Sequence, residues 1–276
     1  MQEEEENRFE QPRPVKGRKG ARGVGGVLVA LAVLAAKFKT IFAVLLSFKW
    51  LLLAPKLLLS FGSIFLSLWF YATIFGWKFG IVFVAMIFVH EMGHLLTFRN
   101  FGIPVSLPYF IPGLGAFVSS PMSPDPARNA VAALAGPAFG VAAAAVCWGY
   151  AVTTGEPFWT ACAYAGFFIN LFNLIPALPL DGGRVAGVID NRLYLLGVAI
   201  FVIWIIAFRH FSAFTFLILI FIVGSSVPRA LAAWRGQIDP REAVPRGARV
   251  AIGIAYLGLI AVTVAGAAAT TGARPV

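Results

Sequence analysis

Five consecutive residues have the types and the spacing of a metal-dependent hydrolytic centre. They are His90-Glu91-Met92-Gly93-His94, which match the pattern H-E-x-x-H. Residues four apart on a helix project from the same face, so both imidazoles can bind one zinc ion. Glu91 is not needed as a ligand, and its carboxylate can take a proton from a water molecule that the metal activates. Because a catalytic zinc takes three protein ligands and keeps one position open, a third ligand must come from elsewhere in the chain.

The setting of this motif strengthens the metal interpretation. The motif lies in an apolar run from Phe79 to Phe98, close to the roughly 20 residues that span a bilayer. An ionisable residue at membrane depth costs about 3 kcal/mol or more, so three together require a functional reason. The alternative is that the histidines are packed in a helix end and hydrogen-bonded to backbone carbonyls.

The composition predicts an all-α polytopic membrane protein. Of the 276 residues, 59% are apolar and 12% are charged, whereas soluble domains average roughly 45–50% and 25%. We expect about six transmembrane helices in a lipid bilayer, an N-terminal interfacial or hairpin segment, and a short β element after the motif helix. The net charge of +10 does not indicate nucleic acid as a partner, because the basic residues lie between apolar runs.

Four segments are expected along the chain. Residues 1–26 are polar and are predicted to form a disordered cytoplasmic tail. Residues 27–56 hold two apolar pieces separated by lysines, which favours a basic amphipathic segment at the membrane surface or a hairpin. Residues 57–230 would form the core that carries the motif. Residues 231–276 would form a basic link and a C-terminal transmembrane helix.

The basic residues also predict an orientation. If the spans alternate from Leu57 onward, most arginines of the links fall on one side of the membrane, with Lys78 and Arg209 on the other. By the positive-inside rule the first side is the cytoplasm, so we expect a cytoplasmic N-terminus in a multi-pass protein of a bacterial plasma membrane. His94 lies five residues before Arg99, or about 7.5 Å along a helix, so the metal would lie near the cytoplasmic face.

Asp181 is the candidate for the third ligand. In this topology it lies at the cytoplasmic end of its span, at a depth similar to that of His90 and His94. Pro176 and Pro179 interrupt the helix just before it, which frees backbone and lets a carboxylate point into a cavity. The alternative is a simple turn aspartate, which is common in Asp-Gly sequences.

Two asparagines lie one helical turn apart, upstream of Asp181. Either Asn170 or Asn173 could hydrogen-bond a substrate backbone or a developing oxyanion. Hydrogen bonding between helices is the alternative role for asparagine in a membrane. We favour a functional role for Asn173 and a packing role for Asn170. The remaining histidine, His210, is expected to be a solvated turn residue.

Together these residues resemble the site-2 protease family of intramembrane zinc metalloproteases. The resemblance rests on H-E-x-x-H in a membrane helix, on Gly136-Pro137 with Gly140, and on the stretch from Asn173 to Gly183, which is similar to N-x-x-P-x-x-x-L-D-G. It implies that His90, His94 and Asp181 bind zinc, that Glu91 is catalytic, and that Asn173 helps to hold the substrate.

The resemblance also implies a substrate and a way of binding it. The substrate would be a transmembrane protein that is cleaved near the cytoplasmic face in regulated proteolysis. Gly115, Ala116, Phe117 and Val118 are similar to the family's strand that pairs with an unwound substrate. The sequence shows no PDZ insertion between the motifs and no room for a CBS domain, and it predicts no particular oligomeric state.

Two other functions fit part of the pattern. A metal-ion transporter could use His90, His94 and Asp181 as a transit site, but transporters usually show internal repeats and polar residues along a path, and neither is seen here. An inactive scaffold that binds helices would not need the carboxylate of Glu91. The sequence therefore favours the protease.

Overall fold

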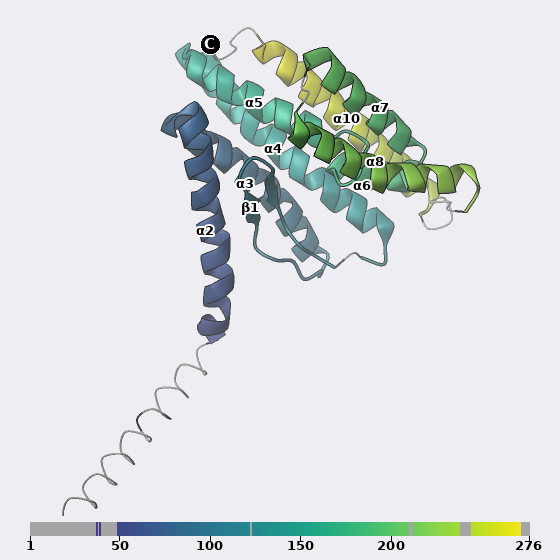
Figure 1. Cartoon of the computed structure of the whole chain (residues 1–276), viewed down its shortest axis with the longest axis horizontal. Coiled ribbons are helices and arrows are strands. Elements are labelled where there is room, and N and C mark those ends of the chain that lie inside the picture. The colour runs from purple at the N-terminus through teal and green to yellow at the C-terminus, as the bar shows by residue number, and fades with distance from the viewer. Residues whose placement is uncertain are drawn as a thin grey trace, which may run out of the picture. The chain divides into compact units, whose positions relative to one another are not determined.

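The computed structural model describes residues 37, 39, 49–121, 123–209, 212–237 and 244–271, and over these residues it is mainly helical with one small β-hairpin (Figure 1). The helices are α2 (Lys49–Phe75), α3 (Trp77–Asn100), α4 (Pro126–Thr154), α5 (Pro157–Asn173), α6 (Asp181–Ile189), α7 (Leu193–Phe208), α8 (Ala213–Trp234) and α10 (Arg246–Thr270). The predicted tail 1–26, most of the segment 27–56, and His210 lie outside the described residues. The chain divides into two compact units, Met1–Pro55 and Lys56–Val276, and the candidate site lies in the second.

The expected polytopic membrane architecture is confirmed by helix length and composition. Five of the described helices are long and apolar enough to cross a membrane. Their spans are Pro55–Phe75, Trp77–Asn100, Pro126–Thr154, Thr215–Trp234 and Arg246–Thr270. Helix α5, with 17 residues, and the apolar part of α7 are shorter.

Helix α4 is the central element of the second unit, because it packs against α3, α5, α6 and α10. Local sequence determines where it begins and ends. The side chain of Asp125 caps it by accepting a hydrogen bond from the Ala127 amide at 2.9 Å, and Pro126 occupies its first turn. It ends at Gly155, whose φ of 71° is left-handed.

Small residues let the neighbouring helices approach the backbone of α4. A Cβ atom on Gly93 would lie 2.3 Å from the carbonyl oxygen of Ala135, and one on Gly140 would lie 2.2 Å from Oδ1 of Asn170. A larger residue at position 93 would push α3 away from the backbone of α4, and one at position 140 would displace the Asn170 side chain of α5. Gly136 and Gly140 therefore permit the close helix packing that their spacing predicts.

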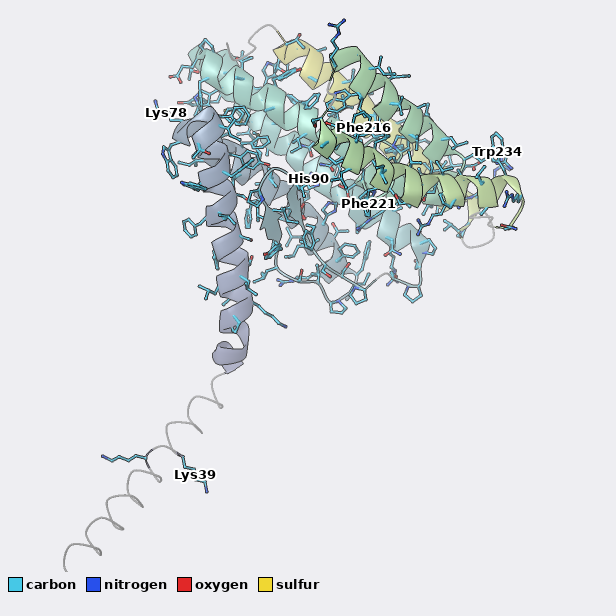
Figure 2. The ribbon with its side chains drawn as sticks, viewed as in Figure 1. Lys39, Lys78, His90, Phe216, Phe221 and Trp234 are labelled. Atoms are coloured by element: carbon cyan, nitrogen blue, oxygen red, sulfur yellow. The ribbon has the colours of Figure 1, made fainter. Side chains whose placement is uncertain are left out.

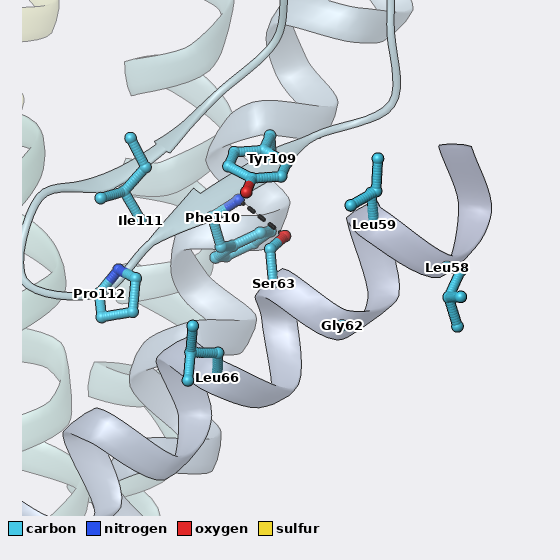
Figure 3. Close-up of a pocket in the computed structure, with 9 residues that line it drawn as sticks. All are labelled: Leu58, Leu59, Gly62, Ser63, Leu66, Tyr109, Phe110, Ile111 and Pro112. Carbon is cyan, nitrogen blue, oxygen red and sulfur yellow. Dashed lines mark hydrogen bonds between the residues drawn. The ribbon is translucent and has the colours of Figure 1, made fainter. Parts of the chain in front are cut away.

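The connector between α3 and α4 contains the expected β element. Strand β1 (Tyr109–Ile111) pairs antiparallel with β2 (Gly115–Phe117), with Phe110 opposite Ala116. The backbone of β1 is also tied to α2, because the Phe110 amide donates to Ser63 Oγ at 3.0 Å (Figure 3) and Ser60 Oγ donates to the Pro108 carbonyl at 2.6 Å. The outer edge of β1 is thus already occupied by serine hydroxyls.

This arrangement determines which backbone groups of β2 are free. Alternate residues of a strand direct their N–H and C=O groups to opposite sides. Since Phe110 directs its amide away from β2 and toward Ser63, Phe110 and Ala116 form a non-hydrogen-bonded pair. The amide and carbonyl of Ala116 therefore face away from β1, toward the outer edge of β2.

Candidate metal centre

Helix α3 carries the motif into the protein interior. His90, Glu91 and His94 are 6%, 4% and 5% exposed, and Figure 2 shows His90 among the packed helices. The i, i+4 spacing brings the two imidazoles together, with Nε2 of His94 lying 3.1 Å from Nε2 of His90. The structure thus places both motif histidines on one buried face, as the spacing predicts.

Asp181 completes a triangle with these two nitrogens. It is the first residue of α6 and follows His90 by 91 positions in the chain. Its Oδ2 lies 3.2 Å from Nε2 of each histidine. Ligand atoms around a tetrahedral zinc ion lie about 3.3 Å apart when the metal–ligand distances are about 2.0–2.1 Å. The three atoms therefore have the mutual spacing that a bound zinc requires.

The hydrogen-bond partners of the imidazoles fix their tautomers. Nδ1 of His94 lies 2.8 Å from the carbonyl oxygen of Ala132, which can only accept. Nδ1 of His90 lies 2.8 Å from Oδ1 of Asn170, whose Nδ2 donates to the Gly166 carbonyl at 2.7 Å. Both Nδ1 atoms are therefore donors. In the neutral rings both Nε2 atoms carry a lone pair toward the Asp181 carboxylate, and a cation stabilises such a convergence of acceptors.

Glu91 has a different environment from Asp181. Its Oε2 is buried and has no hydrogen-bond partner among the described residues. One of its oxygens lies within 4.8 Å of the ligand atoms of His90 and His94, so Glu91 could also hold a metal. Asp181 Oδ2, at 3.2 Å from both Nε2 atoms, has the spacing of a third ligand, which would leave the Glu91 carboxylate available for proton transfer.

Gly136 of helix α4 lies directly against one side of this centre. A Cβ atom on Gly136 would lie 2.1 Å from Nε2 of His94, the atom that faces Asp181. Glycine is therefore required at this position for His94 to keep its orientation. The residues of α4 thus contribute the space around the centre, and Ala132 contributes a hydrogen-bond acceptor.

The two asparagines of α5 have different surroundings. Asn170 is 1% exposed and contacts His90. Asn173 is partly buried, and its Nδ2 donates to the Ile169 carbonyl of its own helix at 3.1 Å. The contact of Asn170 with His90 was not anticipated from the sequence. A chemical rule could have indicated it, because a metal-bound histidine needs an acceptor for its other N–H, and Asn170 is a polar residue in an apolar helix.

The segment from Gly115 to Val118 lies against the helix that bears the motif. Strand β2 packs on α3, and Ala116 packs on a buried cluster that includes Val84 and Ile87. Ile87 precedes His90 by less than one helical turn. The hairpin is therefore a neighbour of the part of α3 that leads into the centre.

Comparison with known proteins identifies one family. A model of peptidase family M50 matches residues 78–156, which include the motif helix α3 except its first residue, and all of α4. No curated protein matches the chain. The match confirms the resemblance to the site-2 protease family, and with the buried His90, Glu91 and His94 it supports a membrane-embedded metallopeptidase.

Proposed function

We propose, from this match to peptidase family M50, that the chain is an intramembrane zinc metalloprotease that hydrolyses peptide bonds of transmembrane proteins. The observation that carries the proposal is the convergence of His90, His94 and Asp181 on one point, beside Glu91, whose buried Oε2 has no hydrogen-bond partner in the described part of the chain. We propose zinc as the metal because catalytic zinc sites use ligand sets of two imidazoles and one carboxylate and leave a fourth position open.

Each residue of the centre has a separate task in this proposal. Nε2 of His90, Nε2 of His94 and Oδ2 of Asp181 would hold the zinc. When bound, the zinc polarises the scissile carbonyl and makes the attacking water more acidic. Glu91 accepts the proton of that water and then transfers it to the nitrogen of the leaving amine. Asn170 keeps the His90 ring in the tautomer that leaves Nε2 free.

The substrate must bind as an extended chain, because a helix hides its peptide groups in its own hydrogen bonds. The outer edge of β2 offers the backbone groups of Ala116 for strand addition, while the serines of α2 occupy the corresponding edge of β1. We assign the substrate contact to residues Gly115–Val118 and a second, polar contact to Asn173.

The orientation follows from the arginines of the links. Arg99 lies in the last turn of α3 and marks the cytoplasmic end of that helix. In this orientation cleavage takes place near the cytoplasmic face. The family resemblance supports a role in regulated proteolysis, and we assign the protein to a bacterial plasma membrane.

The test compares wild type with Glu91→Gln in the full-length protein. Both should contain zinc, measured by elemental analysis, and only wild type should cleave a co-expressed model membrane substrate, because the substitution removes the proton acceptor. Loss of a general base costs about 10²–10⁴-fold in rate. Equal cleavage by the two proteins would contradict the proposed protease mechanism. A transporter would instead move metal into vesicles, and that flux would survive the substitution.

A further inference from the structure

The segment that leads to Asp181 is held by helices that lie outside the family match. It consists of residues 174–180, between the end of α5 and the start of α6. Helices α8 and α10, which follow it by many residues, contact it directly through side-chain hydroxyls. This part of the chain has no role in the mechanism above.

Two serines of α8 bind both backbone groups of Leu178. The Leu178 amide donates to Ser226 Oγ at 2.9 Å. Ser225 Oγ lies 2.9 Å from the Leu178 carbonyl and 2.7 Å from the Phe221 carbonyl of its own helix, and these two acceptors share its one proton. Ser226 is fully buried. From α10, the buried Tyr256 donates its hydroxyl to the Leu174 carbonyl, at the C-terminus of α5. The segment is therefore anchored at Leu178 to α8 and at Leu174 to α10.

Close contacts restrict the same segment from other directions. A Cβ atom on Gly197 of α7 would lie 2.3 Å from the Pro176 carbonyl oxygen. A Cβ atom on Gly182 would lie 2.2 Å from the Leu174 carbonyl oxygen. The backbone thus has little room to shift toward either α7 or α6.

The backbone groups of residues 174–180 need hydrogen-bond partners from other helices. The end of a helix leaves carbonyl groups without partners, and irregular backbone inside a membrane protein must find partners within the protein. The prolines at 176 and 179 have no N–H to donate. The hydroxyls of Ser226 and Tyr256 supply the partners that the segment itself lacks.

We propose that Ser226 and Tyr256 are positioning residues of the metal centre. The Asp181 carboxylate contacts the two imidazoles and, among the described hydrogen bonds, no other group. Its position therefore depends on the backbone of residues 174–180, which the hydroxyls of Ser226 and Tyr256 hold at Leu178 and Leu174. Through that backbone the two hydroxyls determine where the carboxylate lies relative to the metal. This inference rests on the proposed function, since it takes Asp181 as the third zinc ligand.

The experiment uses Tyr256→Phe and Ser226→Ala in the full-length protein, in detergent or lipid nanodiscs. We expect each to weaken zinc binding about tenfold, measured by competition with a chelator, as loss of supporting contacts around a metal typically does. The absorption spectrum of the cobalt-substituted protein should change, because it reports ligand geometry. For substrate cleavage kcat should fall while KM stays constant. Ser226→Thr retains the hydroxyl and should restore zinc affinity.

Thr263→Ala is the matched control on α10. It removes a fully buried hydroxyl that donates only within its own helix, to the Leu259 carbonyl. It should change thermal stability without changing zinc affinity or the cobalt spectrum. If Ser226→Ala fails to fold, Tyr256→Phe decides the question, because it keeps the ring and deletes a single oxygen.

The outcomes separate the two proposals. Wild-type zinc affinity and cobalt spectra in both variants would overturn the positioning role, even if the melting temperature fell. A wild-type protein that neither binds zinc nor cleaves substrate would overturn the proposed function itself. Weakened zinc binding in both variants, with normal binding in Thr263→Ala, supports the positioning role.

Discussion

Oδ1 of Asn170 lies 2.8 Å from Nδ1 of His90, and this contact joins α5 to the motif helix α3. The amide nitrogen of Asn170 donates to the Gly166 carbonyl, so the amide oxygen is the atom that faces His90, and it accepts from the ring. Gly140 leaves the space that the asparagine side chain occupies. One buried amide therefore orients the ring of His90 and determines which nitrogen is free to bind metal.

We predict that Asn170→Leu weakens zinc binding on the order of 10–100-fold, because the Nδ1–H of His90 loses its acceptor. Chelator competition measures the effect. Asn173→Ala is the contrasting variant, since Asn173 contacts its own helix and not His90. It should retain zinc and slow cleavage of the substrate. If Asn170→Leu binds zinc as wild type does, the contact is only helix packing.

Replacement of Asp181 should affect zinc more than folding. In Asp181→Ala two histidines remain, and they leave the metal under-coordinated. We expect lower zinc stoichiometry and affinity, measured by elemental analysis after dialysis against a weak chelator. Asp181 also occupies the first turn of α6, and unchanged zinc binding would reduce its role to that of a turn residue.

Gly136→Ala should abolish metal binding, because its Cβ would lie 2.1 Å from Nε2 of His94. Zinc content and cleavage should both fall to background. Gly149→Ala is the control on the same helix, since no described heavy atom lies within 4 Å of a Cβ placed there. It should keep zinc and activity, and alanine stabilises a helix by roughly 0.5–1 kcal/mol relative to glycine. Equal zinc content in the two variants would contradict the close approach of α4.

Val118→Pro tests substrate pairing at the outer edge of β2. Phe117 is paired with Tyr109 of β1, and the Ser119 carbonyl accepts from the Ser106 amide at 2.8 Å. Backbone groups on both sides of Val118 therefore face residues 106–111, and those of Val118 face outward. Proline removes one outward N–H and should reduce cleavage, while zinc content and thermal stability stay near wild type.

Two further variants show whether this effect is specific to the outer edge. Val118→Thr keeps the β-branched shape and should be mild. Phe117→Pro removes a donor that faces β1, and it should destabilise the hairpin itself. Normal cleavage by Val118→Pro would contradict strand addition at this edge.

The sequence by itself determined the features that depend on local geometry and on composition. The apolar runs set the membrane class, because their length and hydropathy belong to each segment alone. The spacing of His90 and His94 placed both imidazoles on one face, since four residues make about one helical turn. The sequence predicts an extended segment from Gly115 to Val118, although it does not identify the partner strand β1.

Only the tertiary structure decided how distant segments meet. Asn170 and Asn173 are similar in sequence context, but a helix places them at different heights and angles, and only packing against α3 selects Asn170 as the partner of His90. The approach of Asp181 to within 3.2 Å of both histidines likewise depends on where α5 ends and how α6 begins. The hydroxyls of Ser226 and Tyr256 reach the intervening backbone from other helices, and no local pattern encodes contacts between residues so far apart in the chain.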